Sequence, residues 1–241
     1  MTIEDWLARF DPKNEIVMIN IDLLVQYGAV YKKVSAGEMI FLEGGLCLYY
    51  HQLVEGRVAW SNFNDDGKEI LQELVSAGEC FGELPLFDHQ GYACTSVALT
   101  DCLILRLPSA SFSKLLDEQP QIALAFNRLL ARKMRFKMFL LRELAGHSPE
   151  KMVDKLLKYL HEHSDKVCNT CNKLLLTRQQ IANLTGMRVE TVIRATRALE
   201  NQGRVNIVKG KVFLTSPKGN SDHCERGSGE SKHVHASRQL S

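Results

Sequence analysis

Glu190 and Arg194 are the residues of this 241-residue chain whose types and spacing most clearly suggest a defined chemistry. Residues four apart lie side by side on one face of a helix, so the carboxylate and the guanidinium would be presented together. A guanidinium can donate two hydrogen bonds to O6 and N7 of guanine, and a carboxylate can accept one from N4 of cytosine. The pair therefore has the chemistry needed to recognise base edges in a DNA major groove.

The segment that must position this pair, residues 177–204, predicts two short helices joined by a tight turn. Thr177 and Gln180 have capping-box spacing at the start of the first helix, and Gly186 stands where a helix would end with a positive φ. The second helix has an inner apolar stripe of Val192, Ala195 and Leu199. An ordinary helical hairpin with a solvated charged face would show the same pattern, so the rest of the chain must decide.

Four other side chains, His161, His163, Cys168 and Cys171, fall within eleven residues and offer nitrogen and sulfur ligands. Zinc prefers such ligands, and the two cysteines could instead form a redox-switchable dithiol. The two histidines are separated by about 200° around a helix, so both can bind one metal only if the helix ends there. We therefore expect no metal site, and interpret the four as histidines at a helix end and incidental loop cysteines.

The composition is typical of a globular protein, with 45% hydrophobic and 24% charged residues. No apolar stretch is long enough to span a membrane, and the first residues, MTIEDWLARFDPKNE, lack the basic and apolar regions of a signal peptide. The seven cysteines have scattered spacing that does not suggest a disulfide framework. We therefore expect a cytoplasmic protein with no membrane partner.

The net charge of +2 hides an uneven distribution. Residues 1–120 contain 8 lysines and arginines against 18 aspartates and glutamates, whereas residues 121–241 contain 22 against 10. A polyanion would be attracted to the second half alone. This polarity agrees with a DNA-binding role for the pair at 190 and 194.

Between about Val30 and Leu107, short apolar runs alternate with turn signals at the spacing of strands and tight turns. Residues 64–67, Asn-Asp-Asp-Gly, stand between two such runs and predict a hairpin turn. Strands so closely spaced predict a small β-roll or barrel.

Residues 120–145 predict one long helix with two apolar stripes. A surface helix needs only one apolar face, so a second stripe indicates packing against both its own domain and a partner chain. We interpret it as a dimerisation helix; burial inside a monomer is the alternative, which its many basic residues disfavour. The stripes are Leu130, Met134, Leu141 and Leu144, and Phe126, Leu129, Phe136 and Leu140.

The remainder of the chain predicts another helix, a wing and a tail. Ser148 and Pro149 suit the cap and first position of a helix that runs to about His163. Two short strands around Lys209-Gly210 have the pattern of a wing. The predicted domains are a sensing β-roll at 1–119, the dimerisation helix at 120–146, a winged helix-turn-helix at 147–215 and a disordered tail at 216–241.

An α+β chain with an N-terminal β-roll of the jelly-roll type, a long helix and a winged helix-turn-helix resembles the cAMP-receptor-protein/FNR (CRP/FNR) family of bacterial transcriptional regulators. The resemblance covers about residues 20–214. FGELPLF, residues 81–87, is similar to the phosphate-binding cassette of a cyclic-nucleotide-binding roll, and TRQQIANLTGMRVETVIRATRALENQG is similar to the family's DNA-reading unit. The resemblance implies a homodimer that binds double-stranded DNA, and RNA polymerase if it is an activator.

By this resemblance the base-reading residues are Val189, Glu190, Ile193 and Arg194. Val189 is similar to the valine of FNR-type members, and both apolar residues could contact thymine methyl groups. Four arginines are assigned to phosphates, where they add affinity but little specificity: Arg178, Arg188, Arg197 and Arg204. Arg188 replaces the usual Ser or Thr cap of the recognition helix, which weakens that end unless a phosphate occupies it. A two-fold dimer implies a palindromic site, for which we expect TGA half-sites.

The expected effector pocket matches the pocket of cyclic-nucleotide sensors only in part. Its candidate residues are Gly82, Glu83, Leu84, Ala93, Cys94 and Lys137. In cyclic-nucleotide sensors the cassette glutamate bonds the ribose and a later arginine holds the phosphate; here the glutamate is present, but residues 91–96 are GYACTS, without an arginine. A buried phosphate would lose its main charge-assisted bonds. We therefore expect an effector other than cAMP and take Glu83 as a structural relic, with a cyclic-nucleotide-responsive regulator as the alternative.

Other cofactors and classes of protein fit less well. FNR-type oxygen sensors carry an N-terminal cysteine cluster for an iron–sulfur centre, whereas Cys47 is the first cysteine here, so we expect no such cluster. A metal enzyme built on the roll would need several inward ligands, and His51 and His89 are the only histidines of that region. An adaptor that no longer binds DNA is disfavoured by Glu190, Arg194 and the wing. The cofactor is left unidentified.

Overall fold

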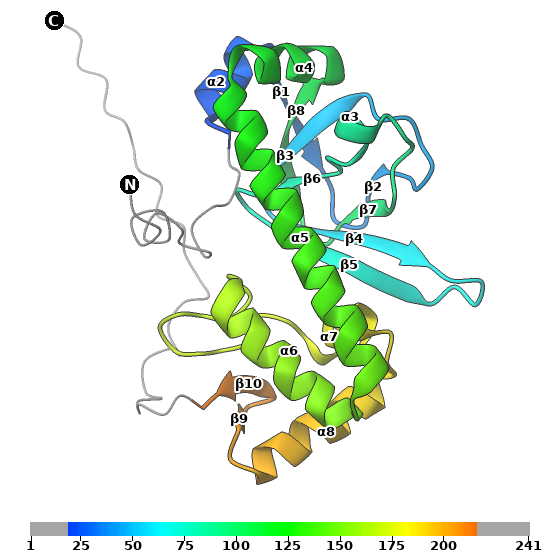
Figure 1. Ribbon diagram of the computed structural model, residues 1–241, viewed down its shortest axis with the longest axis vertical. Coiled ribbons are helices and arrows are strands. Elements are labelled where there is room, and N and C mark those ends of the chain that lie inside the picture. The colour runs from blue at the N-terminus through cyan, green and yellow to red at the C-terminus, as the bar shows by residue number, and fades with distance from the viewer. Residues whose placement is uncertain (1–18, 216–241) are drawn as a thin grey trace, which may run out of the picture.

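The computed structural model describes residues 19–215, and the predicted disordered tail at 216–241 lies outside the described residues. A β-roll and a helical domain lie one above the other and are joined by one long helix (Figure 1). None of the helices within 19–215 has the length and apolar character needed to cross a membrane. The roll comprises α2 (Ile21–Gln26), β1 (Val30–Val34), β2 (Met39–Phe41), β3 (Tyr49–Glu55), β4 (Arg57–Phe63), β5 (Glu69–Ser76), β6 (Cys80–Phe81), α3 (Pro85–Asp88), β7 (Thr95–Ala98), β8 (Cys102–Pro108) and α4 (Ser109–Glu118). The long helix α5 (Pro120–Gly146) precedes α6 (Pro149–His163), α7 (Arg178–Thr185), α8 (Val189–Asn201), β9 (Val205–Val208) and β10 (Lys211–Leu214).

The β-roll consists of two antiparallel four-stranded sheets, with strand orders β1-β8-β3-β6 and β2-β7-β4-β5. Side chains from both sheets form one apolar core, which includes Val34, Val58 and Ile104. The predicted hairpin turn joins β4 to β5, where the Asn64 carbonyl accepts from the Gly67 N–H at 2.9 Å. The roll expected from the strand pattern is confirmed.

A second apolar cluster fastens α4 and the first turns of α5 to the roll. The ring of Tyr50 on β3 stacks on Phe112 of α4, with 4.9 Å between ring centroids. Phe126 of α5 meets Phe112 edge-on at 5.4 Å. All three rings are buried, so α5 starts from a well-packed base.

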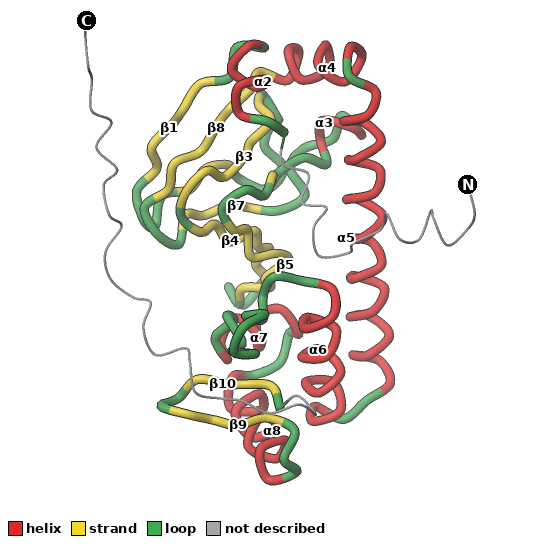
Figure 2. The backbone as a smooth tube through the Cα atoms, turned by 90° about the vertical axis from the view of Figure 1, so that its left-hand side faces the viewer, coloured by secondary structure: helices red, strands yellow, loops and turns green. Residues whose placement is uncertain are grey.

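The long helix α5 runs along both domains (Figure 2). Its apolar residues lie on two faces, as the two sequence stripes predict. Phe126 and Leu140 are buried within the chain, with 0% and 6% of their surface exposed. On the opposite face Met134, Met138 and Leu141 are 62%, 64% and 72% exposed. Met138 adds to the predicted outer stripe, and this face remains open to solvent.

The helices α6, α7 and α8 pack around one core together with the two-stranded wing. Ser148 caps α6 and Pro149 is its first residue, as predicted. β9 and β10 pair antiparallel across Lys209-Gly210, whose φ values are 46° and 75°. Positive φ at both central residues gives a turn that matches the twist of the strands. The winged helix-turn-helix is confirmed.

A buried carboxylate fastens the end of α5 to α6. Glu143 forms ion pairs with Arg142 and Lys155 at 2.7 and 2.8 Å, and His147 Nδ1 lies 3.0 Å from Glu143 Oε2. The hydrogen bond from Lys155 is the largest of the influences that hold the pKa of Glu143 below its ordinary value. The bend between the two helices is therefore held by charge as well as by packing.

Candidate DNA-binding surface and effector pocket

Local hydrogen bonds build the turn that presents α8. The Gln180 N–H donates to Thr177 Oγ1 at 3.1 Å, and the Thr177 N–H donates to Gln180 Oε1 at 2.9 Å, which completes the predicted capping box. Gly186 ends α7 with a φ of 68°, in the left-handed region that glycine adopts without a steric penalty. The cap of α7 and the turn into α8 are thus built by residues of this segment.

The recognition helix α8 buries one face and exposes the other. The buried stripe is the predicted one, Val192, Ala195 and Leu199, which are 0%, 2% and 3% exposed. Glu190, Arg194 and Arg197 lie on the opposite face and are exposed. A carboxylate and two guanidinium groups therefore face solvent from a rigidly packed helix.

The apolar residues of this face are less open than the charged ones. Val189 and Ile193 are half-buried, and Val189 packs against the core of the helical domain. Only part of the Val189 side chain can therefore meet a base. The thymine contacts of these two residues stay predictions.

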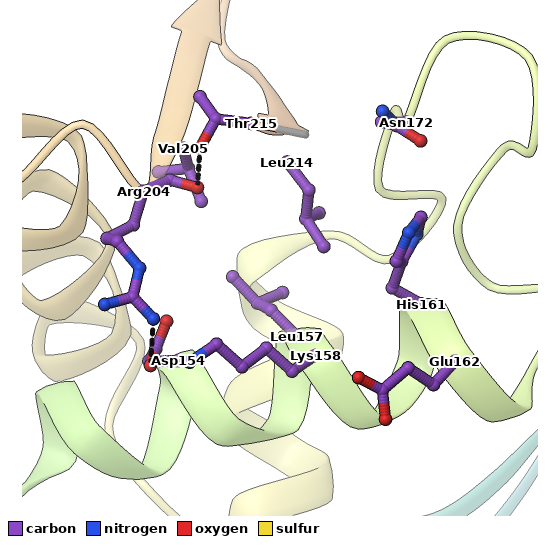
Figure 3. Close-up of a pocket in the computed structure, with 10 residues that line it drawn as sticks. All are labelled: Asp154, Leu157, Lys158, His161, Glu162, Asn172, Arg204, Val205, Leu214 and Thr215. Atoms are coloured by element: carbon purple, nitrogen blue, oxygen red, sulfur yellow. Dashed lines mark hydrogen bonds and ion pairs between the residues drawn. The ribbon is translucent and has the colours of Figure 1, made fainter. Parts of the chain in front are cut away.

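The four arginines predicted to contact phosphates have different surroundings. Arg188 and Arg197 are exposed, and Arg188 occupies the cap of α8 without a side-chain capping hydrogen bond. Arg178 donates to a backbone carbonyl of the wing turn. Arg204 forms an ion pair with Asp154 of α6 at 3.0 Å (Figure 3), so a phosphate would have to compete with that carboxylate.

In the roll, the predicted cassette forms a tight turn after β6. Gly82 has a φ of 68°, and a Cβ at this position would lie 2.6 Å from the ring of Phe41. That ring is held by Tyr92, which stacks on it with 3.8 Å between centroids. Both the backbone conformation and the close ring therefore require glycine here.

Glu83 is completely buried, and its charge is compensated from α5. Lys133 Nζ donates to Glu83 Oε1 at 2.9 Å and pairs with Glu73 Oε2 at 2.7 Å. The same ammonium lies 5.2 Å from the centroid of the Trp60 ring. Burial raises the pKa of Glu83, against the attraction of Lys133. Burial alone would lower the pKa of Lys133, but Glu73 and Glu83 raise it above its ordinary value, so the lysine stays charged.

Lys133 was not among the residues predicted for the effector pocket, although it pairs with the cassette glutamate. Lys137, the cation predicted for the pocket, lies one turn further along α5, where it donates to the backbone carbonyl and to Oε1 of Gln72 at 2.7 and 2.8 Å. Burial lowers the pKa of Lys137. A signal was present, because Lys133 falls between Leu129 and Phe136 at the heptad spacing of the buried stripe.

Ala93 and Cys94, also predicted for the pocket, both bond to Asn62. The Ala93 carbonyl accepts from Asn62 Nδ2 at 2.8 Å, and Cys94 Sγ donates to Asn62 Oδ1 at 3.4 Å. Burial raises the pKa of Cys94 to about 11, against the opposing effect of Lys137. The thiol is therefore protonated near neutral pH. Leu84 is half-buried and packs against the core of the roll.

The four candidate metal ligands, at the end of α6 and in the connection to α7, have different surroundings. His163 stacks on Tyr159 with 4.5 Å between centroids, and His161 lines a shallow pocket beside the wing (Figure 3). Cys168 and Cys171 are half-buried, and neither is in a disulfide. Within residues 19–215, no three His, Cys, Asp or Glu side chains come together in a way that could hold a metal ion.

Two known protein families match the chain, one on each domain. The cyclic nucleotide-binding domain matches residues 31–119, and the Crp-like helix-turn-helix domain matches residues 150–219. The two matches cover the β-roll and the winged helical domain in the order seen in the structure. The chain belongs to the CRP/FNR family. It is a DNA-binding transcriptional regulator of the CRP/FNR type.

Individual CRP/FNR relatives carry names that refer to different signals or processes. The chain is 26% identical over 188 residues to the cAMP-activated global transcriptional regulator Vfr of Pseudomonas aeruginosa, covering 76% of this chain and 87% of Vfr. It is 27% identical over 186 residues to the nitrogen fixation regulation protein FixK of Bradyrhizobium diazoefficiens, covering 76% and 77%. The fold matches the c-di-GMP-responsive regulator CLP of Xanthomonas campestris with a TM-score of 0.65 at 18% identity, covering 81% of this chain and 99% of that chain. Relatedness within the CRP/FNR family therefore does not select an effector.

Proposed function

We propose that a homodimer of this chain binds a palindromic DNA site with TGA half-sites. The exposed pair of Glu190 and Arg194 on α8 carries the proposal. Arg194 would bond guanine and Glu190 would accept from cytosine, with Val189 and Ile193 beside thymine methyl groups. Arg178, Arg188, Arg197 and Arg204 would contact phosphates and set the register.

Dimerisation would use the outer face of α5. Met134, Met138 and Leu141 follow one another at heptad spacing and are the most exposed apolar residues of the helix. Pairing two such helices would remove these side chains from water. It would also relate two copies of α8 by a two-fold axis, which is why the DNA site should be palindromic.

The DNA-binding proposal is tested with a fluorescent duplex that carries a TGA palindrome and a second duplex with both half-sites scrambled. We expect Arg194→Ala to weaken binding to the first duplex about 10- to 100-fold and to abolish the preference between the two. Lys114→Ala, at an exposed position on α4 of the roll, is the matched control and should bind as the wild type does. An unchanged sequence preference in Arg194→Ala would contradict the assignment.

The dimer is tested by sedimentation. We expect the wild type to sediment as a dimer and Leu141→Glu as a monomer, because a carboxylate in the centre of an apolar helix pair would be desolvated without a partner. Leu46→Glu replaces a leucine of the roll that is 78% exposed and is the control. A dimeric Leu141→Glu would place the interface elsewhere.

We infer that the signal sensed by the roll is not cAMP. The support is the ion pair between Lys133 and Glu83, since a ribose hydroxyl would have to compete with an ammonium for the cassette carboxylate. The match to the cyclic nucleotide-binding domain favours the second candidate, a cyclic-nucleotide-responsive regulator. Titrating the TGA duplex with and without cAMP separates the two candidates, since strong enhancement of binding by cAMP would establish the cyclic-nucleotide-responsive regulator.

If the protein activates transcription, RNA polymerase would be a further partner, in the cytoplasm.

A further inference from the structure

The connection between α6 and α7 places two cysteines in one tight turn. The Asn172 N–H donates to the Cys168 carbonyl at 2.8 Å, and the Cys168 N–H donates to the Lys173 carbonyl at 2.8 Å. Val167 and Leu174 then pair as an antiparallel bridge. The segment Cys168-Asn-Thr-Cys171 is therefore the tip of a small hairpin.

The backbone of this turn brings the two cysteines within reach of each other. A hydrogen bond from residue i+4 to residue i closes one helical turn, in which residues three apart have Cβ atoms about 5–6 Å apart. A disulfide needs Cα atoms about 4.4–6.8 Å apart and Cβ atoms about 4 Å apart. A small closure of the turn and rotation of the two side chains would be enough to join the sulfurs.

The same two cysteines are more exposed than those packed in the roll. Cys168 and Cys171 are half-buried, whereas Cys80, Cys94 and Cys102 are only 4%, 6% and 5% exposed. Oxidation of cysteine follows exposure as well as thiolate character. A soluble oxidant would therefore reach the hairpin pair before the three buried thiols of the roll.

The hairpin is bonded directly to the wing. The Leu214 N–H donates to the Asn172 carbonyl at 3.0 Å, and the Leu174 N–H donates to the Val212 carbonyl at 2.9 Å. The segment after Cys171 thus pairs with β10 through an isolated bridge between Lys173 and Phe213, and the chain then reaches the cap of α7 at Thr177. A constraint on the turn would act on the wing and on the start of the helix-turn-helix.

We propose that Cys168 and Cys171 are a redox-active dithiol, which a low-molecular-weight disulfide such as oxidised glutathione converts to an intramolecular disulfide that stiffens the wing. One cysteine thiolate attacks a glutathione sulfur, breaks that S–S bond and releases the first glutathione. The second cysteine attacks the mixed disulfide, forms the Cys168–Cys171 bond and releases the second glutathione. The two cysteines lose two electrons and two protons, and the oxidant becomes two thiols.

The chemical part of the proposal is tested without DNA. Full-length protein is equilibrated in buffers of increasing oxidised-to-reduced glutathione ratio, alkylated and digested. We expect the peptide with residues 168–171 to lose two hydrogens and to regain them with dithiothreitol. Cys168→Ser and Cys171→Ser should stop at the mixed disulfide with glutathione, and Cys47→Ser should behave as the wild type. Pairing of either cysteine with another cysteine, failure to oxidise, or one tightly bound zinc per chain that is lost in Cys168→Ser would overturn the proposal.

The coupling to the wing is tested by hydrogen exchange. Amides of residues 205–215 should exchange more slowly in the oxidised wild type than in the reduced protein, with no such difference in Cys171→Ser. The effect on DNA rests on the proposed function: a stiffened wing should tighten binding to the TGA duplex about threefold, because less ordering remains for the complex. Wing exchange that is the same in both redox states would overturn the coupling. Loss of DNA binding in both states would count against the proposed function alone.

Discussion

The charged residues of α8 and those of the cassette in the roll lie in opposite environments. On α8, Glu190, Arg194 and Arg197 are exposed. In the roll, Glu83 is fully buried and Lys133 bridges it to Glu73. An exposed charge is solvated and can exchange water for a partner, whereas a buried charge must be compensated within the fold. The surface of α8 is therefore open to a ligand, and the cassette carboxylate already has a partner from its own chain.

The cassette turn in the roll is held in place both by packing and by charge. Gly82 and the stacked rings of Phe41 and Tyr92 hold the cassette turn in place. The ion pair to Lys133 instead ties that turn to α5, the helix that continues to the DNA-binding domain. The cassette of this chain is thus a structural joint between the roll and α5.

Among the stability changes, we expect the greatest loss when the lysine that pairs with Glu83 is replaced. Lys133→Met leaves Glu83 buried without its ammonium, which should lower the free energy of unfolding by about 3–5 kcal/mol. Lys114→Met removes an exposed pair with Glu118, at 68% and 50% exposure, and should cost under about 1 kcal/mol. Urea unfolding of both variants measures the contrast. Equal, small losses of unfolding free energy in both variants would contradict this expectation, because the buried pair would then contribute no more stability than an exposed pair.

A second test uses the pH dependence of the roll. Burial, aided by Arg106 and Lys32, lowers the pKa of His51 to about 3. Between that value and the ordinary histidine pKa of about 6.5, the unfolded chain binds a proton that the folded chain does not. The free energy of unfolding should therefore fall as pH drops below about 6.5, by up to about 1.4 kcal/mol per pH unit. His51→Gln should show a shallower fall in urea unfolding measured from pH 7 to pH 4; an identical slope would contradict a buried neutral histidine.

Gly82 in the roll and Gly186 in the helix-turn-helix allow a further comparison, because both have a φ of 68°. Alanine at Gly82 would meet the Phe41 ring, whereas nothing lies within 4 Å of a Cβ at Gly186. Gly186→Ala should cost about 1 kcal/mol from backbone strain alone, and Gly82→Ala about 2 kcal/mol or more, because a clash in a packed core is added. Thermal unfolding of both variants provides the comparison. A smaller loss of stability in Gly82→Ala than in Gly186→Ala would mean that the rings of Phe41 and Tyr92 can move aside at little cost.

The smallest expected effect concerns Arg197, beside the base-reading pair. If it contacts only a phosphate, Arg197→Ala should weaken binding to the TGA and scrambled duplexes alike, and reduce the slope of log K against log salt concentration by about 1. Binding titrations over a range of salt concentrations measure both quantities. A loss confined to the TGA duplex would instead make Arg197 a base reader.

Features with local causes could be predicted from the sequence. The capping box of Thr177 and Gln180, the turn at Gly186 and the inner stripe of α8 each depend on residues within one or two helical turns. The strand pattern of the roll and the two faces of α5 follow from periodicity in the same way. The heptad position of Lys133 indicated only that it lies on the buried stripe; its ion pairs could not be predicted, because its partners lie 50 and 60 positions away in the chain. The same holds for the pairing of Arg204 with Asp154.

The order of the elements and the identity of the charged face of α8 could be predicted from local sequence patterns alone. The reason is that helix caps, turn glycines and apolar periodicity act over a few residues and need no distant partner. Which charges already have a partner within the chain follows from the folded structure, since an ion pair depends on distance and burial. This distinguishes the exposed arginines of α8 from the buried lysine of the roll, which have the same charge but opposite environments.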